Sequence, residues 1–137
     1  MSEFGIFVKS FIVYKRRALI IQRSNYSGRG DGEWDIPGGG LQFGESPLEC
    51  LLREVKEEVG LTVCVDRMLY AMSFVSSPTR QNIGLFYLSY TDSDNVILSH
   101  EHSHFLWATK KQIAELVSKT VLEDYDRNSV FEILDID

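Results

Sequence analysis

Three glutamates stand close together in the sequence, at Glu54, Glu57 and Glu58. If this segment is helical, they share a patch about 100° wide on its surface, on the side away from the core. Like charges three and four residues apart repel one another on a helix, and Arg53 offsets only part of that cost. Hard divalent cations, magnesium in particular, bind carboxylate oxygens together with water and phosphate oxygens. The cluster therefore predicts a divalent-metal site suited to phosphate chemistry.

The same pattern has a plainer interpretation, in which the glutamates form a solvated acidic face. The flanking residues favour the metal site. Five residues separate Gly39 from Glu45, seven more lead to Arg53, and the run continues through Gly60 to Leu61. This arrangement resembles the Nudix box at every defining position. An accidental match in a chain of this length has a probability on the order of 10⁻⁷.

The resemblance implies a MutT-like hydrolase that uses Mg²⁺, with Mn²⁺ as an alternative. Its substrate would be a small nucleotide, either a nucleoside triphosphate or another nucleoside diphosphate derivative, in which water attacks phosphorus. Glu54 and Glu58 would be the main metal ligands, and Glu57 a ligand directly or through water. The carbonyl of Gly39 would complete the set, and Arg53 would orient the carboxylates.

The motif leaves open which residue removes the proton from the attacking water. In the family this base comes either from the helix, where Glu57 is the candidate, or from a later loop, where Glu101 is the candidate. Three histidines alternate around Glu101 without a partner cluster elsewhere, which favours a solvated loop over a second metal site. They are His100, His102 and His104.

Substrate contacts are expected next to the helix. Gly38 and Gly39 let the backbone approach a ligand closely. Arg23, at the end of a predicted strand, either grips a phosphate or forms a surface ion pair. Glu45 either supports the metal ligands or caps the helix electrostatically. Weaker phosphate candidates are Tyr26, Arg29 and Arg80. Aromatic residues that could choose the substrate, but that fit the core equally well, are Phe74, Phe86, Tyr87 and Trp107.

Two other functions stay open. A domain of this fold could sense a nucleotide without cutting it, although the intact glutamate set argues against this. Other members of the family cut ADP-ribose, nucleotide sugars or dinucleoside polyphosphates. The small size favours the MutT-like alternative, and Pro78 alone, in a predicted turn, does not indicate an ADP-ribose enzyme.

The elements around the motif indicate an α/β fold. Strands are predicted over 4–14, 18–21, 61–75, 81–90 and 105–107, and helices over 46–59, 110–119 and 121–133. Ser46, Pro47, Glu49 and Gly60 mark both ends of the first helix. Its buried stripe is predicted to contain Leu48, Leu51, Leu52, Val55 and Val59. Residues 24–33 are predicted to form a surface loop. The resemblance implies a Nudix-type α/β/α sandwich with a mixed β-sheet.

Composition limits the partners. The 137 residues suit one domain, 1–137, and carry a net charge of −6, which disfavours a nucleic acid polymer. The N-terminal apolar run is broken by Lys9 and matches no membrane span or secretory signal, so the predicted location is cytoplasmic. Cys50 and Cys64 have no metal or redox spacing and are predicted to be small core residues. A homodimer stays open.

Overall fold

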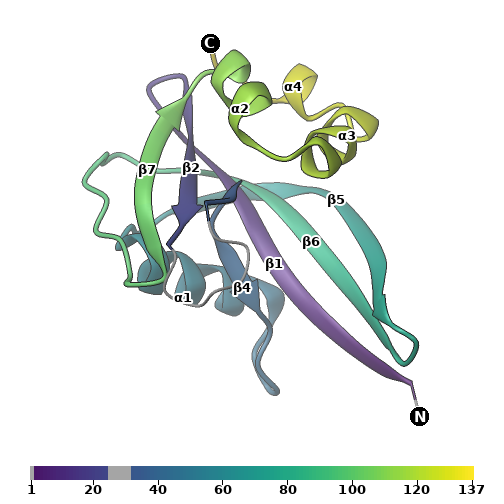
Figure 1. Cartoon of the computed structure of the whole chain (residues 1–137). Coiled ribbons are helices and arrows are strands. Elements are labelled where there is room, and N and C mark those ends of the chain that lie inside the picture. Colours follow the sequence, from purple (N-terminus) through teal and green to yellow (C-terminus); the bar gives the residue numbers. More distant parts are fainter. Residues whose placement is uncertain (1, 25–31) are drawn as a thin grey trace.

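A computed structural model describes residues 2–24 and 32–137 of the chain. Its centre is a mixed sheet in the order β3-β2-β1-β6-β5, with β4 paired to β1 and β7 paired to β2 (Figure 1). β1 and β6 run parallel, and the other pairs are antiparallel. The strands are β1 (Glu3–Tyr14), β2 (Arg17–Arg23), β3 (Trp34–Asp35), β4 (Gly38–Gly40), β5 (Cys64–Ser77), β6 (Arg80–Tyr90) and β7 (His102–Ala108).

Helices cover both faces of this sheet (Figure 1). One face packs on α1 (Pro47–Val59), and the other packs on α2 (Lys110–Leu116), α3 (Lys119–Arg127) and α4 (Val130–Ile133). The strands alternate to feed both cores, since Phe11 points to the second layer and Ile12 to the first. Successive side chains of a strand point to opposite faces. The predicted mixed sheet with flanking helices is confirmed.

Both ends of α1 form as predicted. Ser46 accepts a hydrogen bond from the Glu49 amide, and the Glu49 side chain accepts one from the Ser46 amide. Gly60 ends the helix in the left-handed conformation, at φ 72°. That conformation costs glycine little because it has no Cβ.

The predicted buried face of α1 is partly wrong. Leu48 and Leu52 are 49% and 45% exposed, whereas Cys50, Leu51, Val55 and Val59 are buried. The predicted buried stripe is therefore rotated around the helix axis from the observed one, toward Leu48 and Leu52. Around the helix axis, Glu54 and Glu58 lie between the buried Cys50 and Leu51, and both glutamates are only partly exposed. Because β4 passes beside this face, the two carboxylates meet a backbone strand instead of open water.

Several other elements differ from the prediction. The predicted helix 110–119 ends at Leu116, where Val117 pairs with Trp34 in an isolated bridge. The predicted helix 121–133 is broken at Ser129, which has φ 56°. The strand predicted over 61–75 is β5, which begins later than predicted, at Cys64. The Cys64 side chain is exposed, so its predicted place in the core is wrong. Across the two described stretches, no helix is long and apolar enough to cross a membrane.

Candidate active site

Two glycines of strand β4 lie where a side chain would not fit, Gly38 against strand β1 and Gly39 against helix α1. A Cβ on Gly38 would collide with the backbone of Val8 and Lys9, and one on Gly39 would collide with the Glu54 carboxylate. The amide of Gly38 donates a 2.8 Å hydrogen bond to Oε1 of Glu58. The backbone at these two glycines thus lies against the helix glutamates Glu54 and Glu58, and the close approach to a ligand stays a prediction.

Arg53 donates hydrogen bonds to three carboxylates, one before helix α1 and two on it. Its Nη2 and Nε donate to the two oxygens of Glu45 at 2.7 and 3.1 Å. Its Nη1 donates to Glu54 at 3.0 Å and to Glu57 at 3.3 Å, and Nη2 also donates to the Gly40 carbonyl at 3.2 Å. The hydrogen bonds to Arg53 lower the pKa of Glu45 to about 2. Glu45 is therefore a firm anchor for Arg53.

Burial makes ionisation of Glu54 and Glu58 unfavourable. Desolvation raises the pKa of Glu58 to about 7, although the Gly38 amide and Lys9 oppose the shift, and repulsion from Glu54 and Glu101 adds to it. Desolvation also raises the pKa of Glu54, against the hydrogen bond from Arg53. A bound cation would favour the ionised form of both groups.

The donor chemistry fits a hard divalent cation, since the carboxylates of Glu54 and Glu58 lie against the backbone of β4. Within residues 2–24 and 32–137, no three acidic, histidine or cysteine side chains form a group that could hold a metal as they stand. The hydrogen bonds explain this arrangement, because Arg53 holds Glu54 and Glu57 while the Gly38 amide holds Glu58. Metal binding would require these carboxylates to turn toward one point.

A small polar pocket of about 70 Å³ opens beside Glu58 and Gly38. Arg23 lines it, so the strand-end arginine does lie next to the metal-ligand candidates. Four further polar residues also line it: Lys9, Glu33, Asp35 and His102. The sequence pattern predicted a phosphate-binding role for none of them. Lys9 and Asp35 form an ion pair with a 2.6 Å separation. A lysine inside an otherwise apolar strand was the available signal for Lys9.

The loop candidate Glu101 is exposed and does not line the polar pocket, although the next residue, His102, does. Its charge contributes to the raised pKa values of both Glu54 and Glu58, so it stands on their side of the molecule. Its carbonyl accepts a 2.9 Å hydrogen bond from the Ser24 amide. The tertiary structure thus brings Glu101 toward the helix glutamates, as the base hypothesis requires.

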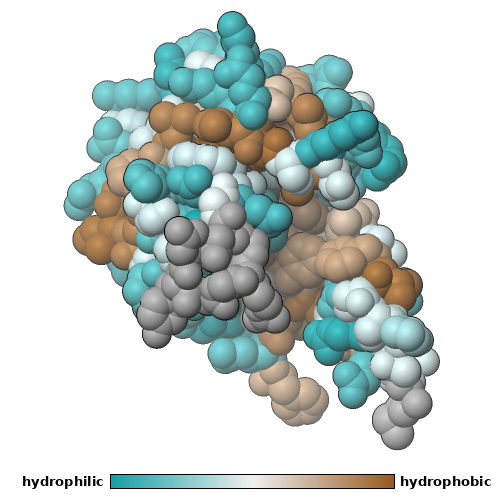
Figure 2. All heavy atoms as spheres, viewed as in Figure 1, coloured by the Kyte–Doolittle hydropathy of each residue, from teal (hydrophilic) through white to brown (hydrophobic). Residues whose placement is uncertain are grey.

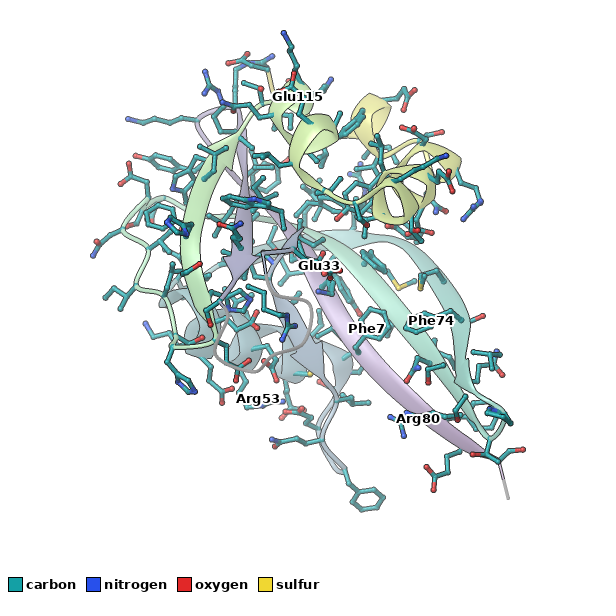
Figure 3. The ribbon with its side chains drawn as sticks, in the orientation of Figure 1. Phe7, Glu33, Arg53, Phe74, Arg80 and Glu115 are labelled. Atoms are coloured by element: carbon teal, nitrogen blue, oxygen red, sulfur yellow. The ribbon has the colours of Figure 1, made fainter. Side chains whose placement is uncertain are left out.

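Other sequence candidates lie elsewhere. Arg80 sits near the far end of the β5–β6 hairpin from Arg53, where it pairs with Glu3 at 3.6 Å (Figure 3). Arg80 also lines an open pocket with Gly40 and Glu45 of the motif, so the phosphate hypothesis for Arg80 stays a prediction. Tyr26 and Arg29 lie outside the described residues. The three histidines do not behave as one solvated group, because His104 is exposed whereas His102 is partly buried.

A larger, mostly apolar pocket of about 420 Å³ adjoins the polar pocket and shares Lys9 and Asp35 with it. It lies between the sheet and α3, where Figure 2 shows a recess with hydrophobic walls. Phe7 and Phe74 lie on the sheet side, with ring centroids 6.2 Å apart (Figure 3). The remaining lining residues are Met72, Phe86, Thr120, Val121, Asp124 and Tyr125. Phe74 and Phe86 are thus pocket residues as well as sheet residues.

Comparison with known proteins agrees with this geometry. Residues 8–128 match the family model described as NUDIX domain. A MutT-like protein of Streptomyces ambofaciens is 28% identical over 103 residues, which cover 75% of this chain and 62% of that protein. An RNA pyrophosphohydrolase of Mannheimia succiniciproducens is 35% identical over 60 residues, or 44% of this chain and 29% of that protein. The chain thus spans less than two thirds of the length of these relatives.

Solved structures match over nearly the whole chain. A MutT protein from Methanosarcina mazei Go1 has a TM-score of 0.82 and 26% identity, covering 96% of this chain and 97% of its own. An Ap4A hydrolase from C. elegans has a TM-score of 0.71 and 19% identity, covering 93% of this chain and 96% of its own, which supports the fold alone. The family match, which covers most of the sequence, shows that the chain belongs to the Nudix domain family.

Proposed function

We propose that this chain is a metal-dependent hydrolase that cuts a diphosphate linkage in a nucleoside triphosphate or another nucleoside diphosphate derivative. The observation that carries the proposal is the junction of two unlike pockets at Lys9 and Asp35. A ligand lying across this junction would present phosphates to Arg23 and the glutamates. Its planar, apolar part would lie between the aromatic residues of the larger pocket.

Glu54, Glu57, Glu58 and the carbonyl of Gly39 would hold the metal, which we propose is Mg²⁺, with Mn²⁺ as an alternative. The ion would neutralise charge on the diphosphate and make the attacking water more acidic. Arg53 donates to both Glu54 and Glu57 in the metal-free protein and would stay beside them as they turn toward the ion.

A carboxylate beside the ligands would take the proton from the attacking water, and the candidates are Glu57 and Glu101. Both side chains are exposed and accessible to water. The water oxygen forms a bond to phosphorus, and the bridging P–O bond breaks with its electron pair leaving on the departing phosphate. Arg23 and Lys9 would bind phosphate oxygens as charge-assisted donors.

We propose a small nucleotide as the substrate in preference to the end of an RNA polymer. The net charge of −6 repels an extended polyanion. A mononucleotide avoids most of this repulsion, because its few charges can be met by the metal, Lys9 and Arg23. The RNA pyrophosphohydrolases among the relatives make a triphosphorylated RNA end the necessary comparison substrate.

The test is to incubate the protein with a panel of substrates and Mg²⁺ and to measure the phosphate or pyrophosphate released. It includes nucleoside triphosphates, ADP-ribose, a nucleotide sugar, a dinucleoside polyphosphate and a triphosphorylated RNA oligonucleotide. Glu57→Gln and Glu58→Gln should each lower turnover by about 100-fold or more. Comparing Glu101→Gln with Glu57→Gln identifies the base, because replacing the carboxylate that takes the proton should cause the larger loss in kcat.

Glu115→Gln is the matched control. Glu115 is exposed on α2, well away from Arg53 (Figure 3), and its variant should turn over at the rate of the parent protein. Unchanged turnover in Glu57→Gln and Glu58→Gln would overturn the site assignment. Nucleotide binding without hydrolysis of any substrate on the panel would instead support a sensing module.

A further inference from the structure

We propose that His102 is a substrate-binding residue whose Nδ1 forms a hydrogen bond with a phosphate oxygen. The proposal rests on the proposed function for the existence of a diphosphate ligand. It adds a contact from strand β7, which contributes none of the glutamates or glycines of the motif.

The backbone places the His102 ring beside the phosphate candidates. His102 is the first residue of β7 and pairs with Arg23 across a register shift between Gln22 and Arg23. Its own amide donates to the Ser99 carbonyl at 3.2 Å, which closes the loop that precedes the strand. Irregular pairing of this kind re-aims a side chain at the edge of a sheet. The ring accordingly lines the polar pocket together with Lys9, Arg23 and Glu58.

One atom of the ring lacks a partner among the described residues. Nδ1 of His102 is buried and forms no hydrogen bond within residues 2–24 and 32–137. Two polar residues that line the pocket with it already have partners, since Lys9 binds Asp35 and Glu58 accepts from the Gly38 amide. In contrast, Nδ1 of the exposed His104 lies 2.9 Å from the Ser103 hydroxyl. An unpaired buried polar atom costs free energy, and a ligand that supplies a partner recovers that cost.

The surroundings favour a phosphate oxygen as the partner. Burial lowers the pKa of His102, and the charges of Arg23 and Lys9 lower it further, while Glu101 and Asp35 oppose the shift. A neutral imidazole carries one N–H, which can reside on Nδ1 and donate. The same two cations would draw the diphosphate into the pocket. His102 then adds a neutral, directional donor beside two charged ones.

The two ring nitrogens can be tested separately. The amide nitrogen of asparagine lies near the position of histidine Nδ1, whereas that of glutamine lies near Nε2. We therefore compare His102→Asn, His102→Gln and His102→Leu, with His104→Leu as the control on the same strand. Calorimetry with a non-hydrolysable nucleotide and with inorganic pyrophosphate, both with Mg²⁺, measures binding without requiring turnover.

His102→Asn should bind both ligands within about threefold of the parent protein, while His102→Gln and His102→Leu should lose about tenfold. Hydrolysis should show the same order in KM, with kcat changing less. Equal affinity in all variants, or equal loss in His102→Asn and His102→Leu, would overturn the proposal. A dominant loss in kcat with unchanged binding would also overturn it.

The design separates this proposal from the hydrolase proposal. An inactive parent protein that still binds pyrophosphate in a His102-dependent manner would refute hydrolysis and support the contact. A thermal melt of each variant reports the fold. If His102→Leu does not fold, the comparison of His102→Asn with His102→Gln decides the question, because both retain a polar side chain.

Discussion

The amide of Gly38 donates a 2.8 Å hydrogen bond to Oε1 of Glu58 and thereby ties strand β4 to the last turn of helix α1. The bond is made to a carboxylate that burial holds at a pKa of about 7. The hydrogen bond from Gly38 stabilises the ionised form of Glu58. Burial opposes ionisation more strongly, because it removes most of the water that would solvate the charge. This balance makes the stability of the metal-free protein depend on pH.

Without metal, stability should fall as pH rises from about 4.5 to 7. The folded protein binds a proton on Glu58 more tightly than the unfolded chain, whose pKa is the ordinary one, so the stabilisation is complete below pH 4.5 and is lost through pH 7. The full change from Glu58 alone is about 3 kcal/mol. Denaturant unfolding in a chelator at several pH values measures it.

Glu58→Gln should flatten this dependence, since the amide still accepts from Gly38 and does not ionise. Glu115→Gln should leave the slope unchanged because its side chain is exposed. A Glu58→Gln variant with the same slope as the parent protein would show that another group controls the titration. Added Mg²⁺ should restore stability near pH 7, because the cation favours the ionised form.

The contact between Gly39 and Glu54 predicts a sharp difference between neighbouring glycines. A Cβ on Gly39 would occupy the position of the Glu54 carboxylate, whereas one on Gly40 meets nothing within 4 Å. Gly39→Ala should therefore displace Glu54 and lower Mg²⁺-dependent hydrolysis by about 10-fold to 100-fold. Gly40→Ala should remain close to the parent protein. Similar activity in the two variants would contradict the assigned role of Glu54.

Arg53 should not be replaceable by lysine. Its guanidinium donates to Glu45, Glu54, Glu57 and the Gly40 carbonyl, a set that a single ammonium group cannot reproduce. Arg53→Lys should reduce stability by about 1–2 kcal/mol and lower turnover as the carboxylates lose their positions. Chemical denaturation and steady-state kinetics measure the two effects. Arg67→Lys, an exposed pair with Asp66, should change neither, and an equal loss there would remove the argument for Arg53.

Adjacent leucines on α1 test its buried face. Leu51 is fully buried and Leu52 is 45% exposed. Leu51→Ala should cost about 2–4 kcal/mol through lost burial and a cavity, and Leu52→Ala less than about 1 kcal/mol. Thermal and denaturant unfolding compare the two. A larger loss of stability in Leu52→Ala than in Leu51→Ala would support the buried face predicted from the sequence and contradict the observed packing of α1.

Local sequence determined the features of this protein that depend on neighbouring residues. Ser46 and Gly60 mark the ends of α1 because capping involves atoms only a few residues apart. The order of residues from Gly39 to Leu61 likewise indicated the family, since the loop and the helix that carry it are continuous in the chain. The Phe, Ile and Val residues over 4–14 predicted a strand, because aromatic and β-branched residues favour strands.

Tertiary structure alone decided which residues meet. The buried face of α1 was misplaced because Leu48 and Leu52 are apolar, yet the sheet does not extend under them, while Cys50 meets β4. Lys9, Asp35 and His102 come from β1, β3 and β7, and their sequence contexts contain no sign of one another. The strand pairings that join them span long stretches of chain. The polar pocket therefore follows from long-range packing, which local hydrogen bonds and propensities do not encode.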